Sequence, residues 1–370
     1  MSREVPLIDL SRMEPIVAKT VAAAIERVRH SGRYLLGSEL ATFEAAFAAW
    51  CGTDHCVGVA NGTDALELAL RALDCGSGDV VATVANAGIY ATVAILAVGA
   101  TPLYVDIDAD CMTMSAAALE AAMSPAVKVV IATHLYGRLA DLDALAAAAP
   151  GVALIEDCAQ AHGAMRDHVR AGAFGAIGCF SFYPTKNLGA MGDAGALTTD
   201  DPDLAATLRA LRSYGWSKRF VATRSGGRNS RLDEMQAAVL SAKLPYVEGW
   251  NARRREIAAI YEQTLSGLNL QLPNTGTVSH VVHLYVVRAG NRDDLAARLR
   301  AAGIGCEVHY PVPDYRQPAV VAALGALAPL AETERAVAEV LTLPCHPWMS
   351  DDEVTQVATA VRASLNANEG

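Results

Sequence analysis

The chain has 370 residues, of which 52% are hydrophobic and 19% are charged. This length favours one large and one smaller folded unit over a single small core, and the composition argues against intrinsic disorder. The net charge of −10 disfavours general binding to nucleic acid.

No signal-peptide pattern opens the sequence, and charges and prolines interrupt every long apolar stretch. The eight cysteines and nine histidines are dispersed, without Cys-x-x-Cys pairs or the spacing of zinc ligands. We therefore expect a cytoplasmic protein with reduced cysteines, no metal site and no membrane-spanning segment.

The first part of the chain alternates between helical and strand-like patterns. An amphipathic helix is predicted over residues 14–30, and seven apolar runs of strand length follow it. These runs are His55–Ala60, Asp79–Val84, Leu103–Asp106, Val127–Thr133, Val152–Glu156, Cys179–Tyr183 and Ala194–Thr199. Helical patterns between the early runs predict a mostly parallel seven-stranded sheet between helices. The last two runs lack a long crossover, which leaves open that part of the sheet runs in the opposite direction.

After about residue 200, helices dominate the predicted elements, and a smaller α/β unit completes the chain. We place the domain boundary near Pro245, which gives a large domain at 1–245 and a small C-terminal domain at 246–370. The small domain is expected to contain strands at 281–288 and 304–308, and helices at 292–302, 330–341 and 351–365.

A first candidate for ligand binding lies between a predicted strand and a predicted helix. Gly62 allows close approach of a ligand, and Thr63 lies where the free amide groups of a helix N-terminus attract a phosphate. An ordinary helix cap provided by Thr63 explains this segment equally well. The segment alone therefore does not distinguish a phosphate site from a helix cap.

The second and third candidates follow the later strands. Asp157 and Gln160 come at the carboxyl edge of a strand, where open parallel sheets bind ligands. Ser181 could bind a phosphate, and Lys186 would be a carbonyl-reactive amine if partial burial lowered its pKa. A carboxylate that bonds local amides and a solvated lysine are the plain alternatives. A dinucleotide fingerprint, a phosphate-binding loop ending in Gly-Lys-Ser/Thr and a Gly-x-Ser-x-Gly elbow are absent from the sequence.

A reactive lysine, a carboxylate for a ring nitrogen and a phosphate cradle are together what pyridoxal 5'-phosphate requires. Beyond this, the chain resembles the DegT/DnrJ/EryC1/StrS sugar aminotransferases along nearly its whole length. The segments that carry the resemblance are Gly32–Gly37, Asn61–Leu66, Gly99–Asp106, His134–Gly137, Glu156–Gly163, Ser181–Lys186, Gly227–Arg231, His309–Pro311 and Leu343–Pro347.

The resemblance implies the α/β fold of type I pyridoxal-phosphate-dependent transferases, and a role for each matching residue. Lys186 would bind the cofactor covalently and move a proton during transamination, with pyridoxamine 5'-phosphate as the intermediate form of the cofactor. Asp157 would bind the ring nitrogen and Gln160 would approach the phenolic oxygen. The phosphate would be held by Gly62, Thr63 and Ser181.

Two further expectations from the resemblance concern the partner subunit and the aromatic residue that stacks on the ring. Asn229 would reach the phosphate of a neighbouring subunit, which implies a homodimer with shared active sites. Tyr90 is the aromatic residue near the place where the family has its stacking side chain. Lys186 also argues against the dehydratase branch of the group, in which histidine replaces the lysine.

The segments around Lys186 and Asn229 resemble members that aminate C3 of nucleotide-linked (dTDP) 3-keto-6-deoxyhexoses, with L-glutamate as the expected donor. A 4-keto nucleotide sugar, a keto-cyclitol and a non-catalytic regulatory role remain alternatives. Candidate substrate-binding residues are Tyr183, Lys218, Arg219, His309 and Tyr310. A solvated loop explains the two basic residues equally well, and core or interface packing explains His309 and Tyr310.

Overall fold

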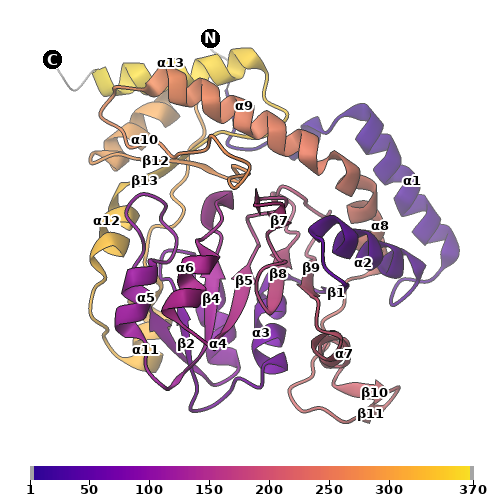
Figure 1. The fold of residues 1–370 in the computed structure, drawn as a ribbon. Helices are drawn as coiled ribbons and strands as arrows, with labels where there is room; N and C mark the ends of the chain where they lie inside the picture. Colours follow the sequence, from indigo (N-terminus) through magenta and orange to yellow (C-terminus); the bar gives the residue numbers. More distant parts are fainter. Residues whose placement is uncertain (1–3, 367–370) are drawn as a thin grey trace.

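The computed structural model describes residues 4–366, and its central element is a seven-stranded sheet (Figure 1). The strand order is β1-β9-β8-β5-β4-β2-β3. The strands are β1 His55–Val59, β2 Val80–Thr83, β3 Thr101–Tyr104, β4 Val127–Thr133, β5 Ala153–Asp157, β8 Ile177–Ser181 and β9 Gly195–Thr199. Strand β9 runs antiparallel to both of its neighbours, and the other pairs are parallel. The mostly parallel sheet is therefore confirmed, and the missing crossover before β9 reflects its reversed direction.

Helices cover both faces of this sheet (Figure 1). Side chains of α3, α4 and α7 form one hydrophobic cluster with the strands, while α2 and α8, and also α5 and α6, pack into clusters on the opposite face. Successive residues of β8 show the division, because Cys179 belongs to the first cluster and Phe180 to the cluster of α2 and α8. These helices are α2 Ser38–Cys51, α3 Gly62–Ala72, α4 Tyr90–Ala97, α5 Ala116–Ala122, α6 Leu142–Ala148, α7 Pro202–Leu211 and α8 Glu234–Lys243.

The C-terminal part packs around a separate hydrophobic cluster beside the carboxyl edge of the sheet. Its antiparallel strands pair Tyr285 with Leu343 and Arg288 with Val340. Its elements are α9 Val247–Leu265, β12 Tyr285–Arg288, α10 Arg292–Ala301, α11 Pro318–Leu324, α12 Ala331–Glu339, β13 Val340–Leu343 and α13 Asp351–Asn366. The division of the chain at residue 245 stays a prediction.

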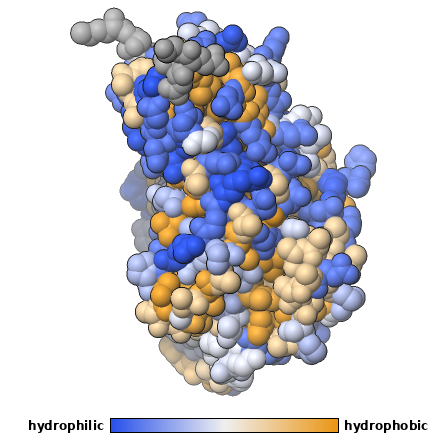
Figure 2. Space-filling model, turned by 90° about the vertical axis from the view of Figure 1, so that its left-hand side faces the viewer, coloured by the Kyte–Doolittle hydropathy of each residue, from blue (hydrophilic) through white to orange (hydrophobic). Residues whose placement is uncertain are grey.

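The remaining described elements are the helix α1 Pro15–Ser31, two short hairpins and four short 3-10 helices at Leu10–Arg12, Leu135–Gly137, Leu244–Tyr246 and Asp314–Arg316. The hairpins pair β6 Met165–Arg166 with β7 Val169–Arg170, and β10 Trp216–Lys218 with β11 Val221–Ala222. Among residues 4–366, no helix combines the length and the apolar character needed to cross a bilayer. On the face shown in Figure 2, hydrophilic residues gather over the upper part and hydrophobic ones are more frequent below.

Three predicted elements of the C-terminal part differ from the structure. The strand predicted at 281–288 begins only at Tyr285. The predicted strand at 304–308 is replaced by isolated bridges, from Ile304 to Val5 and from Glu307 to Thr342. The helix predicted to reach residue 341 ends at Glu339, because Val340 begins the strand that pairs with β12. In the last two places, long-range pairing overrides the local pattern.

Candidate active site

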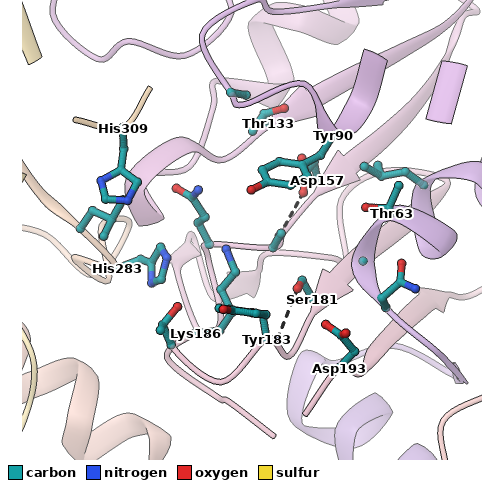
Figure 3. Close-up of a pocket in the computed structure, with 18 of the residues that line it drawn as sticks. Thr63, Tyr90, Thr133, Asp157, Ser181, Tyr183, Lys186, Asp193, His283 and His309 are labelled. Atoms are coloured by element: carbon teal, nitrogen blue, oxygen red, sulfur yellow. Dashed lines mark hydrogen bonds between the residues drawn. The ribbon is translucent and has the colours of Figure 1, made fainter. Parts of the chain in front are cut away.

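A cavity of about 750 Å³ lies at the carboxyl edge of the sheet. Three neighbouring parallel strands end in residues that line it: β4 in Thr133, β5 in Asp157 and β8 in Ser181. The opposite wall comes from the C-terminal part and includes His309 and Tyr310. Figure 3 shows these side chains around the cavity. The sheet register thus brings together residues that are far apart in the sequence.

The start of α3 and the end of β8 form a narrow cradle in the cavity wall. Asn61 caps the helix, because its Oδ1 accepts the N–H of Asp64 at 2.8 Å. The cap is therefore not Thr63, which was the plain alternative for this segment. A Cβ atom on Gly62 would lie 2.6 Å from Cβ of Ser181, which is closer than packed atoms allow. The first-turn amide groups of Gly62 and Thr63 point out of the helix with no intrahelical acceptor.

Lys186 lies at the base of the cavity, five residues after β8, and points into it (Figure 3). Burial lowers the pKa of Lys186 to about 8, although the negative charge of Asp157 counteracts this shift. A large fraction of the lysine is therefore a neutral amine near pH 8, which makes it nucleophilic.

Asp157 faces the same cavity from the end of β5 and is 7% exposed. Burial raises the pKa of Asp157, while the N–H of Ala159, at 3.1 Å from Oδ1, and the Lys186 charge oppose the rise. The local amide bond proposed as the plain alternative is thus present, yet it engages only Oδ1. The carboxylate remains directed at the cavity, where a protonated ring nitrogen would compensate its burial.

Gln160 joins the sheet edge to the opposite wall. Its Oε1 accepts the N–H of Tyr136 at 2.6 Å, and its Nε2 donates to the hydroxyl of Tyr310 at 3.1 Å. The hydroxyl of Tyr136 in turn donates to the backbone carbonyl of His309. Gln160 therefore fixes the segment that carries His309 and Tyr310, a role that the sequence did not indicate.

Tyr90 begins α4 and is 50% exposed at the cavity. Its ring lies 6.3 Å from the ring of Tyr310 at an angle of 77°. Gly88 has a φ of +85°, and a Cβ there would approach the Tyr310 ring to 2.9 Å. The turn before Tyr90 therefore requires glycine on both conformational and steric grounds.

Asp314, from the C-terminal part of the chain, holds this turn through direct hydrogen bonds. Its carboxylate accepts the N–H of Ile89 at 2.9 Å and the hydroxyl of Thr92 at 2.7 Å, so that it brackets Tyr90. Burial raises the pKa of Asp314 to about 6. Sequence reasoning missed Asp314, because nothing local connects residue 314 with residues 89 and 92.

The family model of the DegT/DnrJ/EryC1/StrS aminotransferases matches residues 15–362 of the chain. The chain belongs to this family. It is accordingly an aminotransferase, and pyridoxal phosphate is the family's cofactor, as the sequence predicts.

Three relatives illustrate the similarity. The dTDP-3-amino-3,4,6-trideoxy-alpha-D-glucose transaminase of Streptomyces venezuelae is 44% identical over 362 residues, covering 97% of this chain and 95% of the relative. The UDP-N-acetyl-3-dehydro-alpha-D-glucosamine 3-aminotransferase of Acidithiobacillus ferrooxidans is 39% identical over 366 residues, covering 98% of each. A crystal structure of S. venezuelae DesV in complex with a ketimine intermediate superposes with a TM-score of 0.94 at 44% identity and covers 98% of both chains.

The residues of this aminotransferase fit pyridoxal phosphate on their own geometry. Glycine at 62 leaves a space beside Ser181 that a side chain would fill, at a helix N-terminus suited to a phosphate. At the other side of the cavity, a buried lysine of lowered pKa and a buried carboxylate lie close enough to influence each other's pKa. The cradle, the amine and the carboxylate match the three requirements of the cofactor.

The predicted site residues divide into two groups. Those that line the cavity are Gly62, Thr63, Tyr90, Asp157, Gln160, Ser181, Tyr183, Lys186, His309 and Tyr310. Asn229 pairs with Ser213, and Lys218 and Arg219 lie exposed at the β10–β11 hairpin, where the Arg219 guanidinium stacks on Phe220. These three residues do not line the cavity of their own chain. The role of Asn229 at a partner's phosphate and the roles of Lys218 and Arg219 in binding substrate stay predictions. Thr133, Asp193 and His283 also line the cavity and were not predicted.

Proposed function

We propose that this aminotransferase transfers an amino group from L-glutamate to the keto group of a nucleotide-linked 3-keto-6-deoxyhexose, in the biosynthesis of an amino sugar. The observation that carries the proposal is the pair formed by Lys186 and Asp157 in one buried cavity beside the Gly62–Ser181 cradle. The cavity of about 750 Å³ has room for a cofactor and part of a sugar nucleotide.

Each residue of the pair has a chemical task in this proposal. Bound pyridoxal phosphate supplies an electron sink for the charge that develops on the reacting carbon. Asp157 stabilises a positive charge on the ring nitrogen and so favours the charge-developed state over the ground state. Lys186 Nζ accepts the proton from the α-carbon of the donor, and its lowered pKa suits this transfer near neutral pH.

The cradle orients the reacting groups. Gly62, Thr63 and Ser181 would hold the phosphate through amide and hydroxyl groups, and Tyr90 would be the aromatic partner of the cofactor ring. Because Asp314 and Gly88 fix the turn at Tyr90, we assign the ring-stacking role to Tyr90. A cofactor held at its phosphate and at its ring would present its reactive atom to Lys186 in a fixed direction.

Amination at C3 is supported by the names of the two relatives given above, which both describe 3-amino or 3-dehydro sugars. They differ in the nucleotide, and the more similar one acts on a dTDP sugar. We therefore propose a dTDP-linked substrate. Tyr183, His309 and Tyr310, which line the cavity, would then contact the sugar.

The proposal includes a homodimer with shared sites. Tyr34, Leu35 and Leu36 are three consecutive hydrophobic residues with exposed fractions of 53, 43 and 39%, and Met191 beside the Lys186 loop is 61% exposed. Burial of such residues against a second copy removes apolar surface from water. Asn229, Lys218 and Arg219 would then meet the partner's cofactor and nucleotide. The cytoplasmic location stays a prediction.

A comparison of substrates tests the proposed specificity. Purified holoenzyme with glutamate should aminate a dTDP-linked 3-keto-6-deoxyhexose with a kcat/KM at least about 100-fold above that for the 4-keto isomer, because a misplaced ketone loses its fixed geometry. A preference for the 4-keto sugar or for a keto-cyclitol would contradict amination at C3 while leaving the aminotransferase itself intact.

A further inference from the structure

A second, smaller cavity of about 110 Å³ lies directly beside the main one. Thr185, His283, Leu284 and His309 line both cavities, so the two spaces share a wall that includes the residue before Lys186. Arg254 and His346 line only the smaller cavity. Its lining is therefore rich in nitrogen donors, and it contains no carboxylate.

Arg254, from α9, is 3% exposed and forms no ion pair with a carboxylate of residues 4–366. Its Nη1 donates to the carbonyl oxygens of Val282 at 3.3 Å, of His283 at 3.2 Å and of Cys345, while its Nε has no hydrogen-bond partner in the described part of the chain. Burial lowers the pKa of Arg254 to about 10, so the side chain is still a cation at pH 7. A buried cation without an anion is costly, and most native proteins avoid it.

His346 presents a second group without a partner at the same cavity. The residue is 1% exposed, and neither ring nitrogen makes a hydrogen bond within the described chain. Burial, assisted by the charge of Arg254, lowers the pKa of His346 to about 4. The ring is therefore neutral at pH 7 and has one N–H to donate. Buried polar atoms in native proteins almost always have partners, so this arrangement points to a bound group.

We propose that the smaller cavity is a subsite for a carboxylate of the amino donor, held by Arg254 and the N–H of His346. The inference rests on the proposed function, since it assigns the donor to this end of the site. A volume of about 110 Å³ corresponds to a few water-sized units of about 30 Å³, which is room for a carboxylate and an adjoining methylene group and too little for a nucleotide. A carboxylate there compensates the charge of Arg254 and gives His346 an acceptor.

The two substrates of the reaction are thereby separated in space. The donor extends from Lys186 into the smaller cavity toward Arg254, and the sugar nucleotide occupies the larger cavity.

The test uses His346→Leu, which removes the nitrogen donor, with His162→Leu as the matched control. His162 is also a buried histidine with two unpartnered ring nitrogens, and it packs among Phe180 and Phe182 instead of lining either cavity. Two properties are measured on each holoenzyme: the binding of glutarate by calorimetry, and the KM values for glutamate and for the keto-sugar. Glutarate is the probe because it carries the two carboxylates of glutamate and cannot react.

We expect His346→Leu to weaken glutarate binding and to raise the KM for glutamate at least about tenfold, because a hydrogen bond to a charged group is lost. The KM for the keto-sugar should stay within about twofold of wild type, and His346→Gln, which restores a donor, should recover part of the loss. His162→Leu should change neither value. Equal glutarate binding by wild type, His346→Leu and His162→Leu would overturn the subsite, because water alone would then fill the cavity.

Failure of the subsite is distinguishable from failure of the proposed function. If wild-type holoenzyme binds glutarate through His346 but transfers no amino group from glutamate, the function is wrong and the anion site stands. If glutamate reacts normally in every variant with unchanged KM, the function stands and the subsite is wrong. Should His346→Leu fail to fold, His346→Phe, which keeps a planar ring and removes both nitrogens, allows the same comparison of glutarate affinity.

Discussion

The two walls of the main cavity are built in different ways. On the sheet side, Asp157 and Ser181 end adjacent strands in the register that pairs Asp157 with Cys179, and Lys186 follows directly. On the other side, His309 and Tyr310 lie on irregular chain held by single hydrogen bonds, such as that from Gln160. The regular wall can fix a cofactor in one position, whereas the irregular wall can vary to suit a substrate. We therefore expect substitutions on the sheet side to lower kcat, and substitutions on the opposite wall to raise the KM for the sugar.

The largest expected effect comes from Lys186→Ala on the sheet side. Turnover should fall by about 10²–10⁴-fold or more, because the proton-transfer group is removed together with the covalent attachment. Absorbance of lysine-bound cofactor should vanish, while circular dichroism should show a folded protein. Turnover at the wild-type rate would refute the assigned role.

Asp157→Asn should have the next largest effect. It keeps the shape of the side chain and removes the charge, so we expect kcat to fall by about 10²–10³-fold, as for loss of a preorganised electrostatic contact. The variant should still form lysine-bound cofactor, which absorbance reports. A change only in KM for the sugar would place Asp157 on the recognition side and break the proposed division.

The pH dependence of cofactor uptake measures the environment of Lys186 without turnover. The free amine reacts with pyridoxal phosphate, and burial lowers the pKa of Lys186 to about 8, so the neutral fraction grows as pH rises toward this value. Stopped-flow uptake by apo protein should rise about tenfold per pH unit below about pH 8 and level off above it. A rise that continues to pH 10 would indicate a solvated lysine.

Glycine substitutions test the cradle with a control from the same chain. Gly62→Ala places a Cβ 2.6 Å from Ser181 and should weaken cofactor binding and cost about 1–3 kcal/mol of stability. Gly249→Ala, in α9, meets no atom within 4 Å and should raise stability by about 0.5–1 kcal/mol through helix propensity. Urea unfolding and equilibrium dialysis of the cofactor measure both effects. Equal stability and equal cofactor affinity of Gly62→Ala and Gly249→Ala would contradict a tight cradle at Gly62.

The smallest effect is expected at Asp314, next to the opposite wall. Asp314→Leu removes the acceptors for Ile89 and Thr92 and should cost about 1–2 kcal/mol, as the loss of a helix cap does. Without these bonds the segment that carries His309 and Tyr310 is held less firmly, so the KM for the sugar should rise more than kcat falls. Asp314→Asn retains one acceptor, so its stability and its KM for the sugar should lie between those of wild type and Asp314→Leu. A collapse of kcat with unchanged KM would show that this wall also governs chemistry.

The contrast between the two walls of the cavity also explains which features could be predicted from the sequence. The strands that carry Asp157 and Ser181 were predicted because apolar runs alternate with helices, and parallel strands then place their ends at one edge. Asp314 and Gln160 act through partners more than 20 residues away that only the folded chain brings close. The isolated bridges of Ile304 and Glu307 were mistaken for a strand for the same reason. Local periodicity specifies the sheet, and it carries no information on contacts between irregular segments.

The central claim, that this cavity transfers an amino group to a nucleotide-linked keto-sugar, is tested most directly by separating the two half-reactions. Holoenzyme is treated with excess glutamate, freed of small molecules and then given a dTDP-linked 3-keto-6-deoxyhexose. We predict loss of the lysine-bound cofactor absorbance with one 2-oxoglutarate formed per site, and its return with one amino sugar per site. A spectrum that glutamate and other amino donors leave unchanged would contradict the account.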